Sequence, residues 1–348
     1  MLSLWTSISW KTIMQILIYS YAQSTINKFI IFKIMMDKLA KIKQVVEDIK
    51  SITIQGATNI AKAGIQILAQ ELKKQKFNSL SELKIFLAKA SMLLKNARAT
   101  EPMLFNGLKL ISTKYQVEST KSKDIIQLQK KLSEAGEEYI AEIEKEEELR
   151  PAIGAKIIKN GYNIVTHCHS GSVVKVLTTA RKAGKKIHVY NTETRPLYQG
   201  RRTSTELVKA GVPDTMIVDD AAPFFVDNMY ESHVDIDMII LGCDNIKLDG
   251  SVYNKIGSFA IALSAWHSKI PVYVVGSLTK VDMEKKIEIE ERSGKEVWPE
   301  APKGLEIINY AFDMVPAKFI TGIITQFGII KPKDLKKAVK KYYPRMAH

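Results

Sequence analysis

From Gly161 onwards, short apolar runs alternate with helical segments, and this alternation limits the possible folds more than any other feature of the chain. Five runs have the pattern of short buried strands: residues 162–167, 186–192, 214–220, 237–244 and 271–277. Helical patterns occupy residues 172–184, 204–211, 223–230 and 256–268. Apolar strands that alternate with helices are typical of a parallel sheet covered on both faces. We therefore predict a doubly wound, mainly parallel, Rossmann-like α/β domain.

The part of the chain before this domain carries a helical period throughout. Apolar residues recur at i, i+3 and i+4 spacing in residues 37–50, 59–74, 79–97 and 124–150, which indicates amphipathic helices. Ser79 and Glu82 form a capping box at the start of the third segment. We predict an α-helical N-terminal domain over residues 36–148, followed by the α/β domain over residues 149–348.

Residues 1–35 differ from the rest of the chain. The first acidic residue is Asp37. The segment lacks the charged start, apolar stretch and small-residue cleavage site of a signal peptide, and no run reaches the ~18 apolar residues of a membrane span. Met35 or Met36, followed by DKLAKIKQVVEDIK, has the pattern of a natural chain start. We expect residues 1–35 to be a start-site extension, and a peripheral amphipathic helix is the alternative.

Charge and cysteine content narrow the functional classes. The 348 residues include 51 Lys and Arg against 37 Asp and Glu, a net charge of +14. Such a balance suits nucleic acid, a phosphorylated substrate or an acidic partner. The lysines are spread over amphipathic helices without an aromatic-basic motif, so we do not expect nucleic-acid binding. Two cysteines, Cys168 and Cys243, exclude a disulfide framework and fit a reducing, cytoplasmic compartment.

Reactive and charged residues stand where each predicted strand ends. These strand ends are His167–Ser170, Glu193–Arg195, Asp219–Asp220, Gly242–Asn245 and Ser277–Lys280. Ligands of open α/β sheets bind beyond the carboxyl ends of the strands. We therefore predict one crevice at this edge of the sheet, with a thiol, carboxylates, an arginine and a lysine, which suits an anionic ligand.

The His-Cys-His sequence at residues 167–169 has three interpretations: a metal site, a catalytic cysteine, or a buried cysteine without chemistry. Both histidines of an extended segment point away from Cys168, and no second metal-binding spacing occurs, so we expect neither a metal nor another cofactor. The helix that starts after Ser170 and Gly171 would favour a thiolate and would hold a phosphate. With a protonated Asp244, a Cys168 thiolate would catalyse enolisation. The residues alone leave the buried cysteine open.

Several segments together resemble the superfamily of translation initiation factor 2B α/β/δ subunits, which also contains sugar-phosphate isomerases. They are THCHSGSVVKVL, VYNTETRPLYQGRRTSTEL, LGCDNI, YNKIGSFAIAL and AFDMVPAKFITGIIT. The resemblance covers residues 37–345, including the helical part. The isomerases use a cysteine as proton acceptor and an aspartate as proton donor, whereas the translation-factor subunits generally carry other residues there. The match implies that Cys168 and Asp244 are this pair.

Within the superfamily, THCHS and TETRPLYQG look most like archaeal ribose-1,5-bisphosphate isomerase. The resemblance implies conversion of ribose 1,5-bisphosphate to ribulose 1,5-bisphosphate through a cis-enediol, in an archaeal salvage of AMP and other nucleotides that feeds carbon fixation. It also implies a homo-oligomer, a dimer or hexamer, and leaves open whether AMP activates the protein. The implied substrate contacts are Gln55, Gly56, Ala57, Thr58, Arg98, Ser170, Gly171, Asn254, Lys255 and Lys280.

Two alternatives and three departures accompany this interpretation, and one of the departures is Cys243 beside Asp244. The protein could be a non-catalytic regulatory subunit, or an isomerase of another phosphosugar such as methylthioribose 1-phosphate. Gln55 replaces the arginine of the family's Arg-Gly-Ala turn, and an amide cannot make the charge-assisted phosphate contact of a guanidinium. Lys62 is a candidate to compensate. Gln326 stands where the family tends to carry glutamate.

Overall fold

The structure is a computed structural model that describes residues 33–98, 100–227, 234–283 and 289–344. Most of the expected start-site extension, residues 1–32, lies outside these ranges. Met35 is described and is buried in the core of the helical part. Within the described ranges, none of the helices combines the length and the apolar character that crossing a bilayer requires.

The helical part consists of α2 (Ala40–Lys50), α3 (Ala57–Lys74), α4 (Leu80–Lys95), α5 (Pro102–Lys121) and α6 (Ile125–Ile157). Their apolar stripes meet in one core, with Leu68, Phe86 and Leu104 fully buried. At α4 the Ser79 hydroxyl accepts a hydrogen bond from the Glu82 N–H at 3.1 Å, as the capping box predicts, whereas the Glu82 carboxylate accepts the N–H of Asn78 at 2.8 Å rather than that of Ser79. Helix α5 was not recognised as a whole from its sequence.

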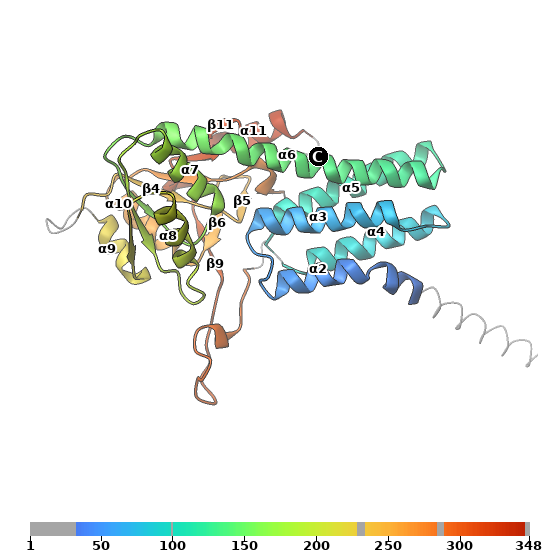
Figure 1. The fold of residues 1–348 in the computed structure, drawn as a ribbon, viewed down its shortest axis with the longest axis horizontal. Helices are drawn as coiled ribbons and strands as arrows, with labels where there is room; N and C mark the ends of the chain where they lie inside the picture. Colours follow the sequence, from blue (N-terminus) through green and yellow to red (C-terminus); the bar gives the residue numbers. More distant parts are fainter. Residues whose placement is uncertain (1–32, 99, 228–233, 284–288, 345–348) are drawn as a thin grey trace, which may run out of the picture.

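The longest helix, α6, runs along both parts of the molecule (Figure 1). It has 33 residues, and the predicted domain division at residue 148 falls inside it. Tyr139 and Ile143 belong to the helical core, whereas Ala155 belongs to the core beneath the main sheet. One continuous helix therefore fixes the helical part against the α/β part.

The main sheet has seven strands in the order β11-β10-β7-β4-β1-β2-β3, and only β11 is antiparallel to its neighbour. Its strands are β1 (Asn163–Thr166), β2 (His188–Thr192), β3 (Asp214–Ile217), β4 (Met238–Leu241), β7 (Val272–Val275), β10 (Gly322–Thr325) and β11 (Gly328–Ile330). The five predicted strands correspond to β1–β4 and β7. The predicted doubly wound parallel sheet is confirmed.

Helices cover both faces of this sheet. The core of one face is shared with α6, α7 (Gly171–Lys182) and α8 (Gln199–Lys209). The core of the other face is shared with α9 (Ala222–Val226), α10 (Ser258–His267) and α11 (Leu335–Tyr342). Residues 289–310 leave the body as an extended arm (Figure 1).

A second, smaller sheet was not predicted. It contains β5 (Asn245–Lys247), β6 (Val252–Lys255), β8 (Val281–Asp282) and β9 (Phe312–Val315), in the order β8-β5-β6-β9. Each strand has two to four residues, too few to show a period-two pattern. Ile246, Val252 and Val315 are fully buried in the core shared with α10. This sheet places Asn254 and Lys255 at the end of strand β6, and α10 begins three residues after Lys255, as the sequence predicts.

We predict that Gly154→Ala destabilises the protein, because Gly154 is the contact point of α6 with α7. A Cβ atom there would lie 2.7 and 2.8 Å from the two methyl groups of Val176, and a valine in a helix has little rotamer freedom to move away. We expect the free energy of unfolding to fall by about 1–3 kcal/mol from overpacking. The measurement is urea unfolding followed by circular dichroism. In an open helix the same change would stabilise by ~1 kcal/mol, so a gain in stability would contradict the packing argument.

Candidate active site

A cavity of about 540 Å³ lies between the helical part and the carboxyl edge of the main sheet. The predicted site residues all line it: Gln55, Gly56, Ala57, Thr58, Arg98, Cys168, Ser170, Gly171, Asp244, Asn254, Lys255 and Lys280. Seven lysine and arginine side chains and four carboxylates contribute to the lining. The helical part supplies the first five of these residues, so neither part forms the cavity alone.

The backbone of Cys168 is held in an unusual conformation. Its φ of 67° lies in the left-handed region, which a non-glycine residue adopts only where its surroundings impose it. The Cys168 N–H donates to the Thr194 hydroxyl at 3.0 Å, and its carbonyl accepts from the Thr203 hydroxyl at 2.9 Å. Asp219 in turn accepts the backbone N–H groups of Thr194 and Arg195 at 2.7 and 2.6 Å. These bonds aim the half-buried thiol at the cavity.

Asp219 and Arg195 therefore support the loop around Cys168 and do not line the cavity. The Arg195 guanidinium turns to the arm and donates to the Val297 carbonyl at 3.1 Å. The sequence predicted that both residues would belong to the crevice, because both follow strands of the sheet. The loop after β2 instead folds over and supports Cys168 from behind.

The expectation of a lowered thiol pKa at Cys168 is wrong. The pKa of Cys168 is raised to about 11, mainly by burial and in smaller part by the charge of Asp244, while the charges of Lys255 and Arg98 oppose the rise. Ser170, not Cys168, caps α7, so Cys168 lies three positions before the first residue of the helix and its thiol gains little from the positive end. At neutral pH the group is therefore a thiol.

Asp244 reaches the cavity from the strand next to that of Cys168. Strands β1 and β4 are parallel neighbours, with Ile164 opposite Met238, so their ends bring the two residues to the same edge. Gly242 makes this approach feasible, because a Cβ there would lie 2.7 Å from the Cβ of Ser170. The thiol and the carboxylate thus line the same cavity, and the charge of Asp244 acts on the Cys168 thiol.

Two helix starts and three residues of the smaller sheet region surround this pair. The N-terminal ends of α3, after Gly56, and of α7, after Ser170, both line the cavity and present free backbone N–H groups to an anion. Lys255 and Lys280 are 7% and 8% exposed. Buried ammonium groups attract a phosphate strongly because water screens them little. Asn254 is held by its bond to the Ser258 hydroxyl at 2.8 Å.

Lys62 does not compensate for the missing arginine at position 55. Its ammonium pairs with Glu144 at 2.7 Å and with Glu147 at 3.9 Å, and it is not among the residues that line the cavity. Gln55 itself is exposed at the cavity mouth. The turn before α3 therefore offers backbone N–H groups and an amide, but not a cation, to a ligand.

Arg98 is held by two carboxylates that sequence reasoning missed. Its Nε donates to Glu290 at 3.0 Å, and its Nη1 lies 3.4 Å from Glu101. Glu101 is fully buried, and burial raises its pKa to about 8 although Arg98 and Lys280 oppose the rise. Glu290 sits at the base of the arm, 192 positions from Arg98. Local sequence therefore held no sign of this second pairing.

The histidine before Cys168 is a core residue. Its two ring nitrogens bond to the Thr192 hydroxyl at 2.6 Å and to the Ile256 carbonyl at 2.7 Å, and burial lowers the pKa of His167 to about 4. Both nitrogens are thus already engaged. Among the described residues, groups of three or more His, Cys, Asp or Glu side chains arranged to hold a metal ion were not found.

The fold and the cavity define a Rossmann-like α/β protein with a cavity lined by basic side chains, a thiol and carboxylates. The model of the initiation factor 2 subunit family matches residues 53–332. The chain belongs to this family.

Relatives within this family carry different names. Ribose 1,5-bisphosphate isomerase of Pyrococcus furiosus is 35% identical over 301 residues, 83% of this chain and 90% of that protein. Methylthioribose-1-phosphate isomerase of Geotalea uraniireducens is 34% identical over 324 residues, 85% of this chain and 90% of that protein.

Solved structures of two proteins from Pyrococcus horikoshii OT3 share the fold. The 5-methylthioribose 1-phosphate isomerase has a TM-score of 0.68 at 31% identity, covering 87% of this chain and 88% of that one. The translation initiation factor eIF-2B has a TM-score of 0.71 at 25% identity, covering 84% and 97%. Catalytic and translation-factor names thus occur on one fold.

We predict that alkylation of Cys168 by iodoacetamide accelerates with pH across the whole range from 7 to 9. Because burial raises the thiol pKa to about 11, the thiolate fraction grows about tenfold per pH unit below that value. The rate is measured by mass spectrometry of the Cys168 peptide, with the Cys243 peptide read in the same samples. A rate that levels off near pH 7 would show a lowered pKa and would contradict the effect of burial.

Proposed function

We propose that this protein is a sugar-phosphate isomerase whose substrate is ribose 1,5-bisphosphate. The observation that carries the proposal is the placement of Cys168 and Asp244 together in a cavity rich in cations. A bisphosphate brings two multiply charged groups, which match seven basic side chains and two helix starts better than one phosphate would. Relatives named ribose 1,5-bisphosphate isomerase, at 31–35% identity, support the same substrate.

In the proposed reaction the sugar ring opens by cleavage of the C1–O4 bond with a proton taken up on O4, and Cys168 removes the proton from C2. The resulting cis-enediol is reprotonated at C1 with the assistance of Asp244. Loss of the proton from the C2 hydroxyl, which offsets the one taken up on O4, then gives ribulose 1,5-bisphosphate. Substrate and product are isomers, so the proton moves within the site and no outside oxidant or reductant enters the balance. Asn254, Lys255 and Lys280, together with Arg98, would hold the phosphates and the developing enediolate charge.

The raised pKa of Cys168 has a consequence for this step. A thiolate whose conjugate acid has a pKa of about 11 is a strong base for a C–H proton, but it is scarce at pH 7. Lys255 and Arg98 lower the pKa of this thiol, and any closer approach of either cation in the substrate complex would raise the thiolate fraction. A higher pKa at Cys168 therefore makes the thiolate a stronger base but lowers the fraction of the protein that carries it.

Two other functions remain as alternatives with specific support. Methylthioribose-1-phosphate isomerases match at 33–35% identity, and Leu197 and Phe312 give the cavity apolar lining on which a methylthio group could rest. A non-catalytic subunit is supported by the uncharged Gln55.

We also propose a homo-oligomer, because Leu263 and Trp266 on α10 and Trp298 on the arm are exposed apolar side chains of a kind that interfaces cover.

We predict that the protein isomerises ribose 1,5-bisphosphate and that Cys168→Ser and Asp244→Asn each abolish turnover. Loss of a proton-transfer group typically costs 10²–10⁴-fold. The measurement is formation of ribulose 1,5-bisphosphate with and without AMP, with methylthioribose 1-phosphate in parallel as competing substrate.

Asp334→Asn is the matched control, because Asp334 is exposed at the start of α11 and is not among the cavity residues. Circular dichroism checks that each variant is folded. Turnover of methylthioribose 1-phosphate alone would move the assignment to that substrate. An absence of turnover on both substrates would favour the regulatory alternative.

We predict that Gln55→Arg lowers the KM for the phosphosugar about tenfold, as expected for one added charge-assisted hydrogen bond. The side chain is exposed at the cavity mouth, so the longer arginine meets little steric resistance. Gln55→Lys separates charge from bidentate geometry, because an ammonium adds the charge alone. A KM that is unchanged in both variants would mean that this turn does not contact the substrate.

A further inference from the structure

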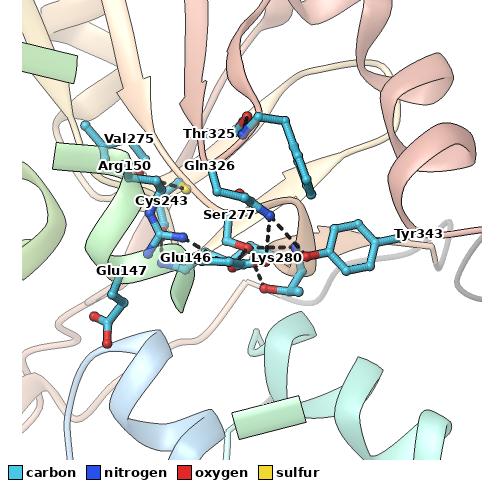
Figure 2. A network of polar contacts seen from close by, with 12 residues as sticks. Glu146, Glu147, Arg150, Cys243, Val275, Ser277, Lys280, Thr325, Gln326 and Tyr343 are labelled. Carbon is cyan, nitrogen blue, oxygen red and sulfur yellow. Dashed lines mark hydrogen bonds and ion pairs between the residues drawn. The ribbon is translucent and has the colours of Figure 1, made fainter. Parts of the chain in front are cut away.

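A buried polar network lies directly behind Lys280, and its centre is the carboxylate of Glu146 on α6 (Figure 2). Glu146 is 3% exposed. One oxygen accepts hydrogen bonds from the Gln326 amide at 2.6 Å and from the Tyr343 hydroxyl. The other accepts from the Ser277 hydroxyl and from Arg150 at 3.3 Å. Four donors from four segments of the chain thus converge on a single side chain.

This arrangement requires an acceptor at position 146. Burial raises the pKa of Glu146, while the bonds from Ser277 and Tyr343 and the charge of Arg150 oppose that rise. A proton on either oxygen would replace an acceptor by a donor and would break one of the four bonds. An unmade hydrogen bond in a buried network is costly, so the network holds its members in one arrangement.

The network reaches the cavity through Ser277. This residue begins the turn that ends in Lys280, η2 (Leu278–Lys280). Its hydroxyl oxygen, after donating to Glu146, accepts the Thr279 N–H at 2.9 Å and lies 2.6 Å from the Thr279 hydroxyl. At the other end of the turn the Lys280 ammonium donates to the Cys243 carbonyl at 2.6 Å. Cys243 immediately precedes Asp244.

We infer that Glu146 is a positioning residue, which acts through Ser277 to hold Lys280 and the backbone before Asp244 in the geometry that binds the substrate phosphate. Glu146 does not touch the cavity itself. The inference rests on the proposed function, because it assigns Lys280 to substrate binding. It also explains why Tyr343, which directly follows α11, is tied to a site formed more than 60 positions earlier: its hydroxyl completes the network.

The same network gives a physical reason for Gln326. A second carboxylate 2.6 Å from Glu146 would place two like charges in a buried site, and one of them would have to take up a proton. The Gln326 amide instead donates to Glu146 and to the Tyr343 oxygen at 3.1 Å. In this chain the carboxylate stands at position 146 and the amide at position 326, so the pair is complementary.

Two sets of variants test the inference. Ser277→Ala removes the link between Glu146 and the turn and leaves the other three donors in place. Glu146→Gln and Gln326→Glu each spoil the pairing, whereas the double variant Glu146→Gln/Gln326→Glu restores one carboxylate and one amide. For Ser277→Ala and for both single variants we expect the KM for ribose 1,5-bisphosphate to rise about tenfold, with kcat within about twofold. For the double variant we expect recovery to within about threefold of the parent KM.

The matched control is Ser133→Ala, since Ser133 is an equally buried serine of α6 that bonds to the Ala69 carbonyl at 2.8 Å, within the helical part. A general loss of stability would affect both serine variants alike, whereas loss of positioning would affect Ser277→Ala alone. A KM unchanged in Ser277→Ala, or no recovery in the double variant, would overturn the inference.

A second readout does not depend on activity. Hydrogen exchange of residues 276–283, followed by mass spectrometry, reports whether the turn is held, because the Thr279 N–H bonds to the Ser277 hydroxyl. We expect faster exchange in Glu146→Gln, which leaves the Ser277 hydroxyl in place, and parent rates in Ser133→Ala and in the double variant. If the parent protein lacks turnover, the proposed substrate fails while the exchange data still decide whether Glu146 holds the turn. Equal exchange in Glu146→Gln and the parent would overturn the inference in either case.

Discussion

The packing of α6 against both parts of the molecule is the constraint on which the cavity depends. Tyr139 and Ile143 lock the helix into the helical core, and Gly154 brings it within van der Waals contact of α7. Since the helical part supplies Gln55–Thr58 and Arg98 while the sheet supplies the thiol and the carboxylate, a shift along α6 would separate the two halves of the site. A single continuous helix resists such a shift better than a flexible linker would, even though Pro151 removes one hydrogen bond from its backbone ladder.

Burial in the cavity disfavours charged side chains, and the structure offsets this cost by pairing them with opposite charges or hydrogen-bond acceptors. Arg98 lies between Glu101 and Glu290, and Lys280 is bonded to the Cys243 carbonyl. Cys168 has only partial compensation, so its pKa rises. Perturbed groups of this kind gather where chemistry or ligand binding takes place. Their convergence on one cavity is what separates this site from an ordinary patch of basic surface.

Membership of the initiation factor 2 subunit family determines the fold. The activity has to be argued from the residues of the site, since one fold supports several functions. Thr194 and Thr203 form hydrogen bonds with the backbone of Cys168, and Asp219 holds Thr194 in place. All of these bonds support the conformation of one residue. A left-handed cysteine held from both sides is a costly conformation. A role for its thiol would account for that cost, and a purely regulatory protein would have less use for it.

Local patterns were sufficient to predict the parallel strands β1–β4 and β7 and the residues at their ends, because side-chain periodicity and strand direction are properties of short segments. The resemblance added Gln55–Thr58 and Arg98. The smaller sheet could not be predicted, since strands of two to four residues carry no period. Contacts such as Glu146 with Tyr343, 197 positions apart, or Arg98 with Glu290 leave no local trace either. The direction of the Cys168 pKa shift likewise depended on how deeply the folded chain buries the thiol, because desolvation arises only when distant segments pack together.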